Sequence, residues 1–266
     1  MNILLTNDDG IDSEGIQKLA DALRSRKDTG GNTVRNTGGK NRVFIIAPDK
    51  NRSGISNALS ILFDPVELIA RGEDTWSCSG TPGDCVIVGL KGALPVLPDL
   101  VLSGINMGAN LGTDLIYSGT AAAARQASLY GIPAIALSLA GKKALHWDMA
   151  ASWSVEHLDE LLKYWRKNAF VNVNIPNIQG GPIGIRTAWP ALKDYRDKMT
   201  SSLSDRGSRL FLLEAGEEVA EKEIGSDCDI ISQNYATIST LYNYPAVFRD
   251  LCPGAPNHAA VAMREG

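Results

Sequence analysis

The chain has 266 residues, of which 44% are apolar and 21% are charged, which is the composition of an ordinary globular protein and excludes disordered and fibrous chains. Its 26 Lys and Arg residues against 30 Asp and Glu residues give a net charge of −4, so we do not expect nucleic acid as the primary partner. The four cysteines include no CxxC pair, so we expect reduced thiols and no zinc cluster.

Short apolar runs alternate with helical patterns along the first half of the chain. Residues 2–6 predict a buried strand, and the apolar spacing over 16–23 predicts a helix. The same patterns then predict, in order, a strand over 43–47, a helix over 84–94, a strand over 100–103, a helix over 120–130 and a strand over 134–139. This alternation predicts an α/β fold with a doubly wound, mostly parallel sheet in a Rossmann-like, three-layer arrangement.

The second half is less regular. It predicts a helix over 149–168, a strand over 170–175 and a strand over 229–240, and the stretch that follows, rich in Pro and Ala, reads as a tail or an arm. We therefore divide the chain into a core over residues 1–180 and an extension over 181–266 that completes this core.

One segment of the core has low complexity. Residues 27–42 contain TGGNTVRNTGG, with two copies of Thr-Gly-Gly, which predicts a flexible inserted loop. Because the segment joins a helix to the following strand, we expect it at the amino edge of the sheet, opposite the ligand crevice.

Common catalytic motifs are missing from the sequence. It contains no GxxxxGKS/T phosphate loop, no GxGxxG fingerprint and no HExxH zinc motif. Its three histidines, His146, His157 and His258, lie outside the loops that follow the predicted strands, and we expect them to be structural or solvated. A residue stretch long enough to span a membrane is also lacking, and Asp8 and Asp9 stand where a signal peptide would be apolar, so a cytoplasmic protein without membrane contact is expected.

The loop after the first strand reads TNDDG over residues 6–10. Its adjacent carboxylates, Asp8 and Asp9, come at the carboxyl end of a strand, where like charges repel unless a cation lies near them. A hard divalent metal would resolve that repulsion. The alternative is that both acids make turn and cap hydrogen bonds ahead of the helix.

Two further loops favour the metal. The second strand is followed by PDKNRSG over residues 48–54 and the third by SGINMGANLG over 103–112, which add hydroxyl, carboxylate and amide oxygens. Loops at the carboxyl ends of parallel strands converge on one crevice. The combined donors are all oxygens, which suits Mg²⁺, Mn²⁺ or Ca²⁺ better than zinc or copper.

Five motifs in order, TNDDG, APDKNRSG, GTPGDC (80–85), SGINMGANLG and IYSGT (116–120), resemble the survival protein SurE family of metal-dependent nucleotidases. The resemblance covers about the first 140 residues, with weaker likeness in NVNIP (172–176). It implies one divalent ion per subunit, Mg²⁺ or Mn²⁺, held by Asp8, Asp9, Ser53 and Asn106. The implied activity is hydrolysis of nucleoside 5′- and 3′-monophosphates to nucleoside and phosphate.

The resemblance also bears on the remaining site residues and on assembly. It implies that Asn110 helps to bind the phosphoryl group, although a plain turn residue is the alternative. Asp8 or Asp9 would also accept a proton from the attacking water, whereas Asp84 and Cys85 read as structural residues, an N-terminal helix cap and a small buried side chain. The resembled family forms dimers or tetramers with exchanged carboxyl-terminal segments, which implies a homodimer or homotetramer with oligomer contacts in residues 181–266.

The start of the predicted helix over 120–130 offers a second half for the phosphate site. Ser118, Gly119 and Thr120 combine two hydroxyls with the unpaired N–H groups of a helix start, which favour an anion. A plain N-cap is the alternative interpretation.

Other functions stay open from the sequence. The same metal site would serve a broader phosphomonoesterase acting on sugar phosphates or an exopolyphosphatase, and a nucleotide-sensing module would bind metal and phosphate without turnover. The segment 27–42 is longer than in the resembled family, and the carboxyl part matches it poorly.

Overall fold

The computed structural model describes residues 1–26, 41–214, 216, 218–220 and 223–245. Its strands are β1 (Asn2–Thr6), β2 (Arg42–Pro48), β3 (Leu68–Gly72), β4 (Thr75–Cys78), β5 (Leu100–Met107), β6 (Ala134–Ala140), β7 (Ala169–Pro176), β8 (Ile185–Thr187), β9 (Lys193–Tyr195), β10 (Lys198–Leu203), β11 (Arg209–Glu214), β12 (Glu218–Ala220) and β13 (Ala236–Tyr242). Its helices are α1 (Glu14–Ser25), α2 (Pro82–Val88), the π-helix η1 (Gly89–Ala93), the 3₁₀-helix η2 (Gly112–Ile116), α3 (Gly119–Leu129), α4 (Trp147–Glu156), α5 (Leu158–Leu162) and α6 (Asp227–Ser232).

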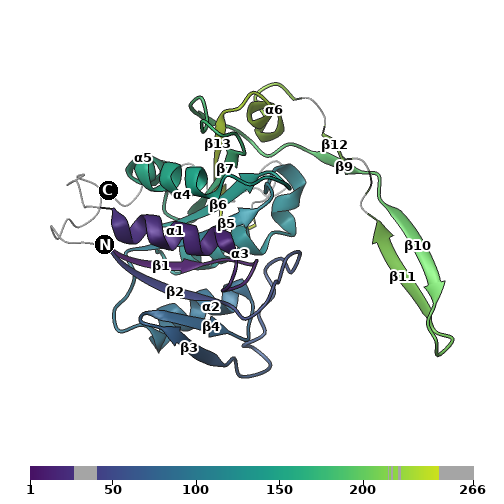
Figure 1. Ribbon diagram of the computed structural model, residues 1–266, viewed down its shortest axis with the longest axis horizontal. Coiled ribbons are helices and arrows are strands. Elements are labelled where there is room, and N and C mark those ends of the chain that lie inside the picture. Colours follow the sequence, from purple (N-terminus) through teal and green to yellow (C-terminus); the bar gives the residue numbers. More distant parts are fainter. Residues whose placement is uncertain (27–40, 215, 217, 221–222, 246–266) are drawn as a thin grey trace, which may run out of the picture.

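A nine-stranded sheet forms the centre of the described part, in the order β3-β4-β2-β1-β5-β6-β7-β13-β8 (Figure 1). Strand β3 is antiparallel to β4 and β13 is antiparallel to β7, and the other neighbours are parallel. The predicted doubly wound, mostly parallel sheet is therefore confirmed. Residues beyond 180 add two strands to it, β8 and β13.

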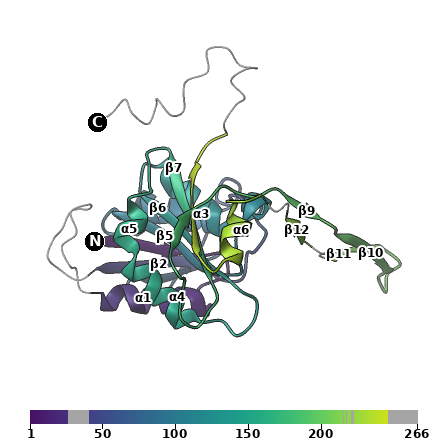
Figure 2. The same cartoon turned by 90° about the horizontal axis from the view of Figure 1, so that it is seen from above.

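Helices cover both faces of this sheet and enclose two apolar cores. Helix α1 turns Ile16, Leu19 and Leu23 onto the first core, which it shares with α4 and α5. Figure 2 shows α1 and α4 on the same side of the sheet. The second core lies under α2 and α3, and the buried alanines of α3 let that helix lie close to β5 and β6. The three-layer prediction is thus confirmed.

Two predicted elements differ in the structure. The helix expected over 149–168 is two short helices, α4 and α5, with His157 between them. The His157 ring stacks on Trp153 at 4.5 Å and contacts the Trp153 carbonyl at 2.9 Å. The strand expected over 229–240 begins only at Ala236. Its first part is helix α6, whose start is capped by the Ser226 hydroxyl, and the apolar residues there include the buried Ile230.

The sequence analysis missed two hairpins. The first, β3–β4, forms one edge of the main sheet. The second, β10–β11, projects from the body as an arm, with every residue of both strands exposed (Figures 1 and 2). The predicted loop over 27–42 lies outside the described residues except for Asn41 and Arg42, and the predicted tail lies outside them beyond residue 245.

The structural roles predicted for Asp84 and Cys85 agree with their positions in the fold. Asp84 accepts hydrogen bonds from the backbone N–H groups of Thr81, Ser60 and Ile61 and completes a capping box at the start of α2, and Cys85 is fully buried, so both have structural roles as predicted. Among the described residues, no helix combines the length and the apolar character needed to cross a bilayer.

Candidate functional site

The loops that follow β1, β2 and β5 meet at one edge of the sheet, as predicted. They enclose a cavity of about 240 Å³ together with the start of α3 and part of β9. Its lining residues are Asp8, Ser53, Gly54, Asn106, Met107, Asn110, Asp114, Tyr117, Ser118 and Tyr195. Five of the eight predicted site residues therefore share one cavity, whereas Asp9, Gly119 and Thr120 lie beside it.

Asp8 is the buried carboxylate of the site, with 3% of its surface exposed. The Thr120 hydroxyl donates a hydrogen bond to its Oδ1 at 2.5 Å. Gly119 permits this approach, since a Cβ at that position would lie 2.8 Å from the Asp8 Cβ. Burial raises the pKa of Asp8, and hydrogen bonds from Thr120 and from the backbone at Gly119 offset part of that rise. The anion at the start of α3 in this structure is thus the Asp8 side chain.

Asp9 faces the end of β5. Its Oδ2 accepts a hydrogen bond from the Met107 backbone N–H at 3.0 Å. Burial raises the pKa of Asp9 to about 6, the Met107 hydrogen bond lowers it, and the charge of Asp8 raises it further. Within the described part of the chain, neither carboxylate forms an ion pair with a lysine or an arginine. Two adjacent, partly desolvated carboxylates without such a partner repel each other, and a bound cation would stabilise their charged forms.

A bulge in β5 directs Asn106 toward the cavity. The register between β5 and β6 shifts between Ser103 and Asn106, and such a bulge bends a strand and re-aims its side chains. Gly104 has a φ of 136°, and a Cβ there would lie 2.3 Å from the Leu137 carbonyl oxygen. The Asn106 amide donates to the Gly108 carbonyl at 2.9 Å, which orients the side chain. Gly104 in β5 therefore permits close contact between β5 and β6.

Ser53 lies on the loop after β2. The Arg52 backbone N–H donates to the Asp8 carbonyl at 2.7 Å and ties this loop to the loop after β1. The Asn51 side chain accepts a hydrogen bond from the Ser53 N–H at 2.7 Å. The exposed Ser53 hydroxyl thus borders the same cavity as Asp8.

A group of buried polar side chains on neighbouring strands holds Asn110. Its backbone N–H donates to Asn174 Oδ1 at 2.8 Å, its side-chain amide donates to the Ser138 hydroxyl at 2.8 Å, and its carbonyl accepts from Asn172 and Asn174. This network explains why NVNIP on β7 carries asparagines at buried positions. Asn110 is therefore fixed at the cavity wall and is no loose turn residue.

Ser118 is the N-cap of α3, because its hydroxyl accepts a hydrogen bond from the Ala121 N–H at 3.0 Å. It also lines the cavity. Ser118 therefore caps α3 and lines the cavity at the same time.

Five of the ten lining residues are not among the predicted site residues: Gly54, Met107, Asp114, Tyr117 and Tyr195. Tyr117 lies inside the IYSGT motif, so its position next to the start of a helix was a usable signal. Tyr195 comes from β9 at the base of the arm and has no motif around it.

The donor set of the site consists of oxygens. Among the described residues, no group of three or more His, Cys, Asp and Glu side chains gathers, so imidazole- or thiolate-rich sites are absent there. Two carboxylates, a hydroxyl and an amide fit a hard divalent cation such as Mg²⁺ or Mn²⁺.

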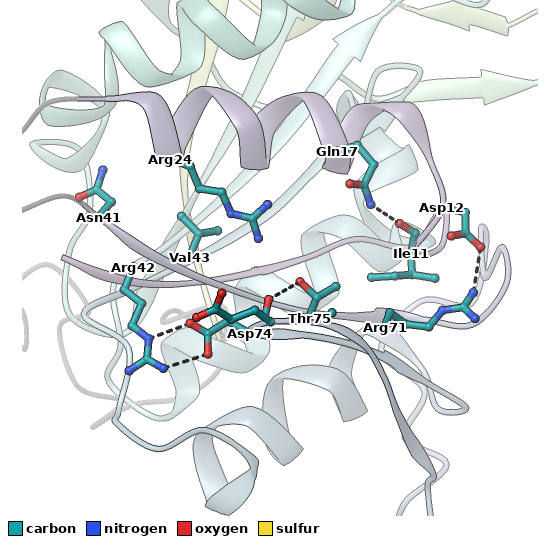
Figure 3. Close-up of a pocket in the computed structure, with 12 residues that line it drawn as sticks. Ile11, Asp12, Gln17, Arg24, Asn41, Arg42, Val43, Arg71, Asp74 and Thr75 are labelled. Carbon is teal, nitrogen blue, oxygen red and sulfur yellow. Dashed lines mark hydrogen bonds and ion pairs between the residues drawn. The ribbon is translucent and has the colours of Figure 1, made fainter.

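A larger cavity, of about 760 Å³, lies between α1 and the β3–β4 hairpin and holds none of the predicted site residues (Figure 3). Two of its acids are paired with arginine: Asp74 takes two hydrogen bonds from Arg42, at 2.7 and 2.9 Å, and Asp12 lies 3.3 Å from Arg71. We call this cavity the α1 groove. Two of its three acids thus have arginine partners, unlike Asp8 and Asp9.

The chain is similar to known proteins over most of its length. The family model described as "Survival protein SurE" matches residues 3–197. The protein named 5′-nucleotidase SurE from Synechococcus elongatus is 38% identical over 260 residues, which cover 91% of this chain and 93% of that protein. Its namesake from Acinetobacter baylyi is 36% identical over 253 residues, covering 91% and 93%. The crystal structure of the SurE protein from Aquifex aeolicus superposes with a TM-score of 0.78 at 30% identity and covers 96% of this chain and 98% of that one.

Proposed function

The chain belongs to the survival protein SurE family, and from this premise we propose that it hydrolyses nucleoside 5′-monophosphates, and also 3′-monophosphates, to nucleoside and phosphate with a bound divalent metal. One observation carries the proposal. The buried Asp8 shares a cavity of about 240 Å³ with Ser53, Asn106, Asn110 and Ser118, and Asp9 lies next to it. The names of the relatives supply the substrate class.

The metal would be held by Asp8, Asp9, Ser53 and Asn106. When bound, such an ion neutralises charge on a phosphoryl oxygen and lowers the pKa of a water. The chain's own residues orient the carboxylates and accept the proton. Thr120 and the start of α3 hold Asp8 in one orientation, and the Met107 N–H does the same for Asp9. Asp8 or Asp9 accepts the proton of the attacking water.

Binding of the phosphoryl group falls to Asn110 and Ser118. The Asn110 amide has a second hydrogen beyond the one it gives to Ser138, and that hydrogen is free to donate to a phosphoryl oxygen. The Ser118 hydroxyl lines the cavity and accepts the capping hydrogen bond through its oxygen, so its hydrogen can donate to a phosphoryl oxygen.

The test is phosphate release from a panel of nucleoside 5′- and 3′-monophosphates, sugar phosphates and polyphosphate, with Mg²⁺, Mn²⁺ or a chelator. We expect turnover of the nucleotides that the chelator abolishes. Equal turnover of every phosphomonoester would replace the proposal with a broad phosphatase, and binding of nucleotide without phosphate release would replace it with a sensing module.

We also propose that the chain acts as a homodimer or homotetramer through the β10–β11 arm. Leu210, Phe211, Leu212 and Leu213 on β11 are 52–65% exposed. An isolated two-stranded hairpin is marginal in water, and exposed apolar patches mark interfaces. Light scattering of the wild type and of Phe211→Asp tests this: we expect an oligomer and a smaller species, respectively, and a monomeric wild type at micromolar concentration would contradict it.

A further inference from the structure

The cavity has a second wall, formed by residues that neither hold the metal nor bind the phosphoryl group in the proposed function. Asp114 and Tyr117, from η2 and its end, form it together with Tyr195 from β9. Tyr117 is 57% exposed and Tyr195 is half-buried, so both rings border the opening and not the core. An aromatic side chain at such a position exposes apolar surface unless a ligand covers it.

The carboxylate of Asp114 is fully engaged within the protein. Its Oδ2 forms an ion pair with the Lys193 ammonium, and its Oδ1 accepts a hydrogen bond from the Tyr195 hydroxyl at 2.5 Å. The Lys193 side chain is 6% exposed, so this pair is sheltered from water. Asp114 therefore holds Tyr195 in place. Unlike Asp8 and Asp9, it has a basic partner.

The segment that carries Tyr195 is anchored to the site. The buried Asp227 accepts hydrogen bonds from the Gly112 N–H at 2.7 Å and the Ala191 N–H at 2.9 Å, which joins the loop before η2 to the chain before β9. The Lys193 N–H donates to the Thr113 hydroxyl at 3.1 Å. Tyr195 is thus a fixed part of the wall although it lies at the base of the arm.

The size of the cavity shows where a substrate must extend. Small-molecule sites usually enclose about 300–1,000 Å³, and this one encloses about 240 Å³. Its polar end, from Asp8 to Ser118, accounts for the phosphoryl group. The rest of a nucleotide then lies at the opening, beside Tyr117 and Tyr195.

We propose that Tyr117 and Tyr195 bind the base of a nucleoside monophosphate by stacking, and that Asp114 and Lys193 are positioning residues for Tyr195. This rests on the proposed nucleotidase function. Every base has a π-face, so stacking tolerates purines and pyrimidines alike. The wall therefore favours nucleotides over phosphate esters without a base and discriminates little among the bases.

The experiment compares AMP with ribose 5-phosphate, which lacks the base, in metal-loaded wild type, Tyr117→Ala and Tyr195→Ala. We expect the ratio of kcat/KM for AMP to that for ribose 5-phosphate to fall about tenfold in each variant, through KM, since stacking on one ring contributes about that much. Tyr195→Phe keeps the ring but loses the bond to Asp114, and its ratio falls between those of the wild type and Tyr195→Ala. Tyr130→Ala is the matched control, because Tyr130 ends α3 away from the cavity and packs on Lys91.

Calorimetric titration of the same proteins with AMP and ribose 5-phosphate gives the corresponding ratio of Kd values without any need for turnover. A wild type that binds AMP but releases no phosphate contradicts the nucleotidase, while a higher ratio of the Kd for AMP to the Kd for ribose 5-phosphate in the two alanine variants still supports the wall. Unchanged ratios, or equal losses for both compounds, overturn the wall even if the enzyme is active.

Discussion

Two cavities in the described part of the chain differ in the charges that line them, and this difference does not follow their sizes. The α1 groove is about three times larger than the cavity at the carboxyl ends of β1, β2 and β5, at about 760 against 240 Å³. In the groove, Asp74 and Asp12 are matched by arginines. In the small cavity, Asp8 is buried with a raised pKa and lacks an arginine or lysine partner among the described residues.

The difference shows what a site for chemistry requires. A paired surface carboxylate has little left to offer a ligand, and exposed ion pairs contribute little to stability. A desolvated carboxylate without a cation costs free energy in the empty protein, and a bound metal recovers it. Buried carboxylates without a basic partner, and not the volume of the cavity, therefore indicate the functional site.

The largest effect that we predict comes from removing that charge. In Asp8→Asn and in Asp9→Asn, kcat/KM for AMP should fall at least about a hundredfold, because each loses a metal ligand and a developing charge loses its stabilisation. Melting curves of the metal-free variants should stay cooperative. Asp12→Asn, in the α1 groove, is the control, and full activity in either site variant would remove the distinction between the two cavities.

The second prediction concerns the support of Asp8. Thr120→Val keeps the shape of the side chain but removes the hydroxyl that donates to Asp8, so kcat/KM should fall about tenfold or more, as expected for a hydrogen bond to a charged group. Thr120→Ser restores the donor and should recover most of the activity. If the valine variant matches the wild type, the start of α3 is only a cap.

Much of this arrangement could be predicted from the sequence, for a physical reason. Strands β1, β2, β5 and β6 are buried on both faces and therefore contain apolar runs, and the loops after parallel strands must meet at one edge. The positions of Asp8, Ser53 and Asn106 after these strands therefore predict that the three residues lie together.

The remainder could not be predicted because its signal is not local. The arm strands are exposed on both faces. Residues 210–213 of β11 form an apolar run, but β10 has no apolar pattern that would indicate a pairing partner. Helix α6 was interpreted as strand because its few apolar residues adjoin those of β13. Tyr195 lies at the cavity beside Asp114, which comes 81 residues earlier in the chain.

The third prediction uses pH to test whether the charged form of the Asp9 carboxylate destabilises the metal-free protein. The pKa of Asp9 is about 6 in the folded protein and 3.8 without its surroundings, so the folded state binds more protons between these values. Stability of the metal-free protein is therefore lost as pH rises from about 4 to about 6. Asp9→Asn lacks this loss.

The measurement is Tm against pH in the presence of a chelator. The Tm of Asp9→Asn minus that of the wild type should increase between pH 4 and 6 and stay constant above pH 7. Added Mn²⁺ should raise the wild-type Tm at pH 7 and have little effect at pH 4, where protons compete for the ligands. A difference in Tm that is the same at pH 4 and pH 7 would show that Asp9 is not strained by burial.

The smallest effect should come from the α1 groove. Arg71→Ala removes the 3.3 Å contact to Asp12, whose side chain is 80% exposed, and water solvates the remaining carboxylate at little cost. A surface change of this kind alters stability by no more than about 0.5 kcal/mol, which is about 1–2 °C in Tm for a chain of this length. Asp12 is only three residues from Asp9, so the substitution also asks whether the groove communicates with the site along the β1 loop. Because the Asn7 side chain binds the Gly10 carbonyl and the Ser13 hydroxyl, that loop has its own support, and we expect kcat/KM within twofold of the wild type. A larger loss would mean that the groove helps to hold Asp8 and Asp9, and the two cavities would then have to be treated as one unit.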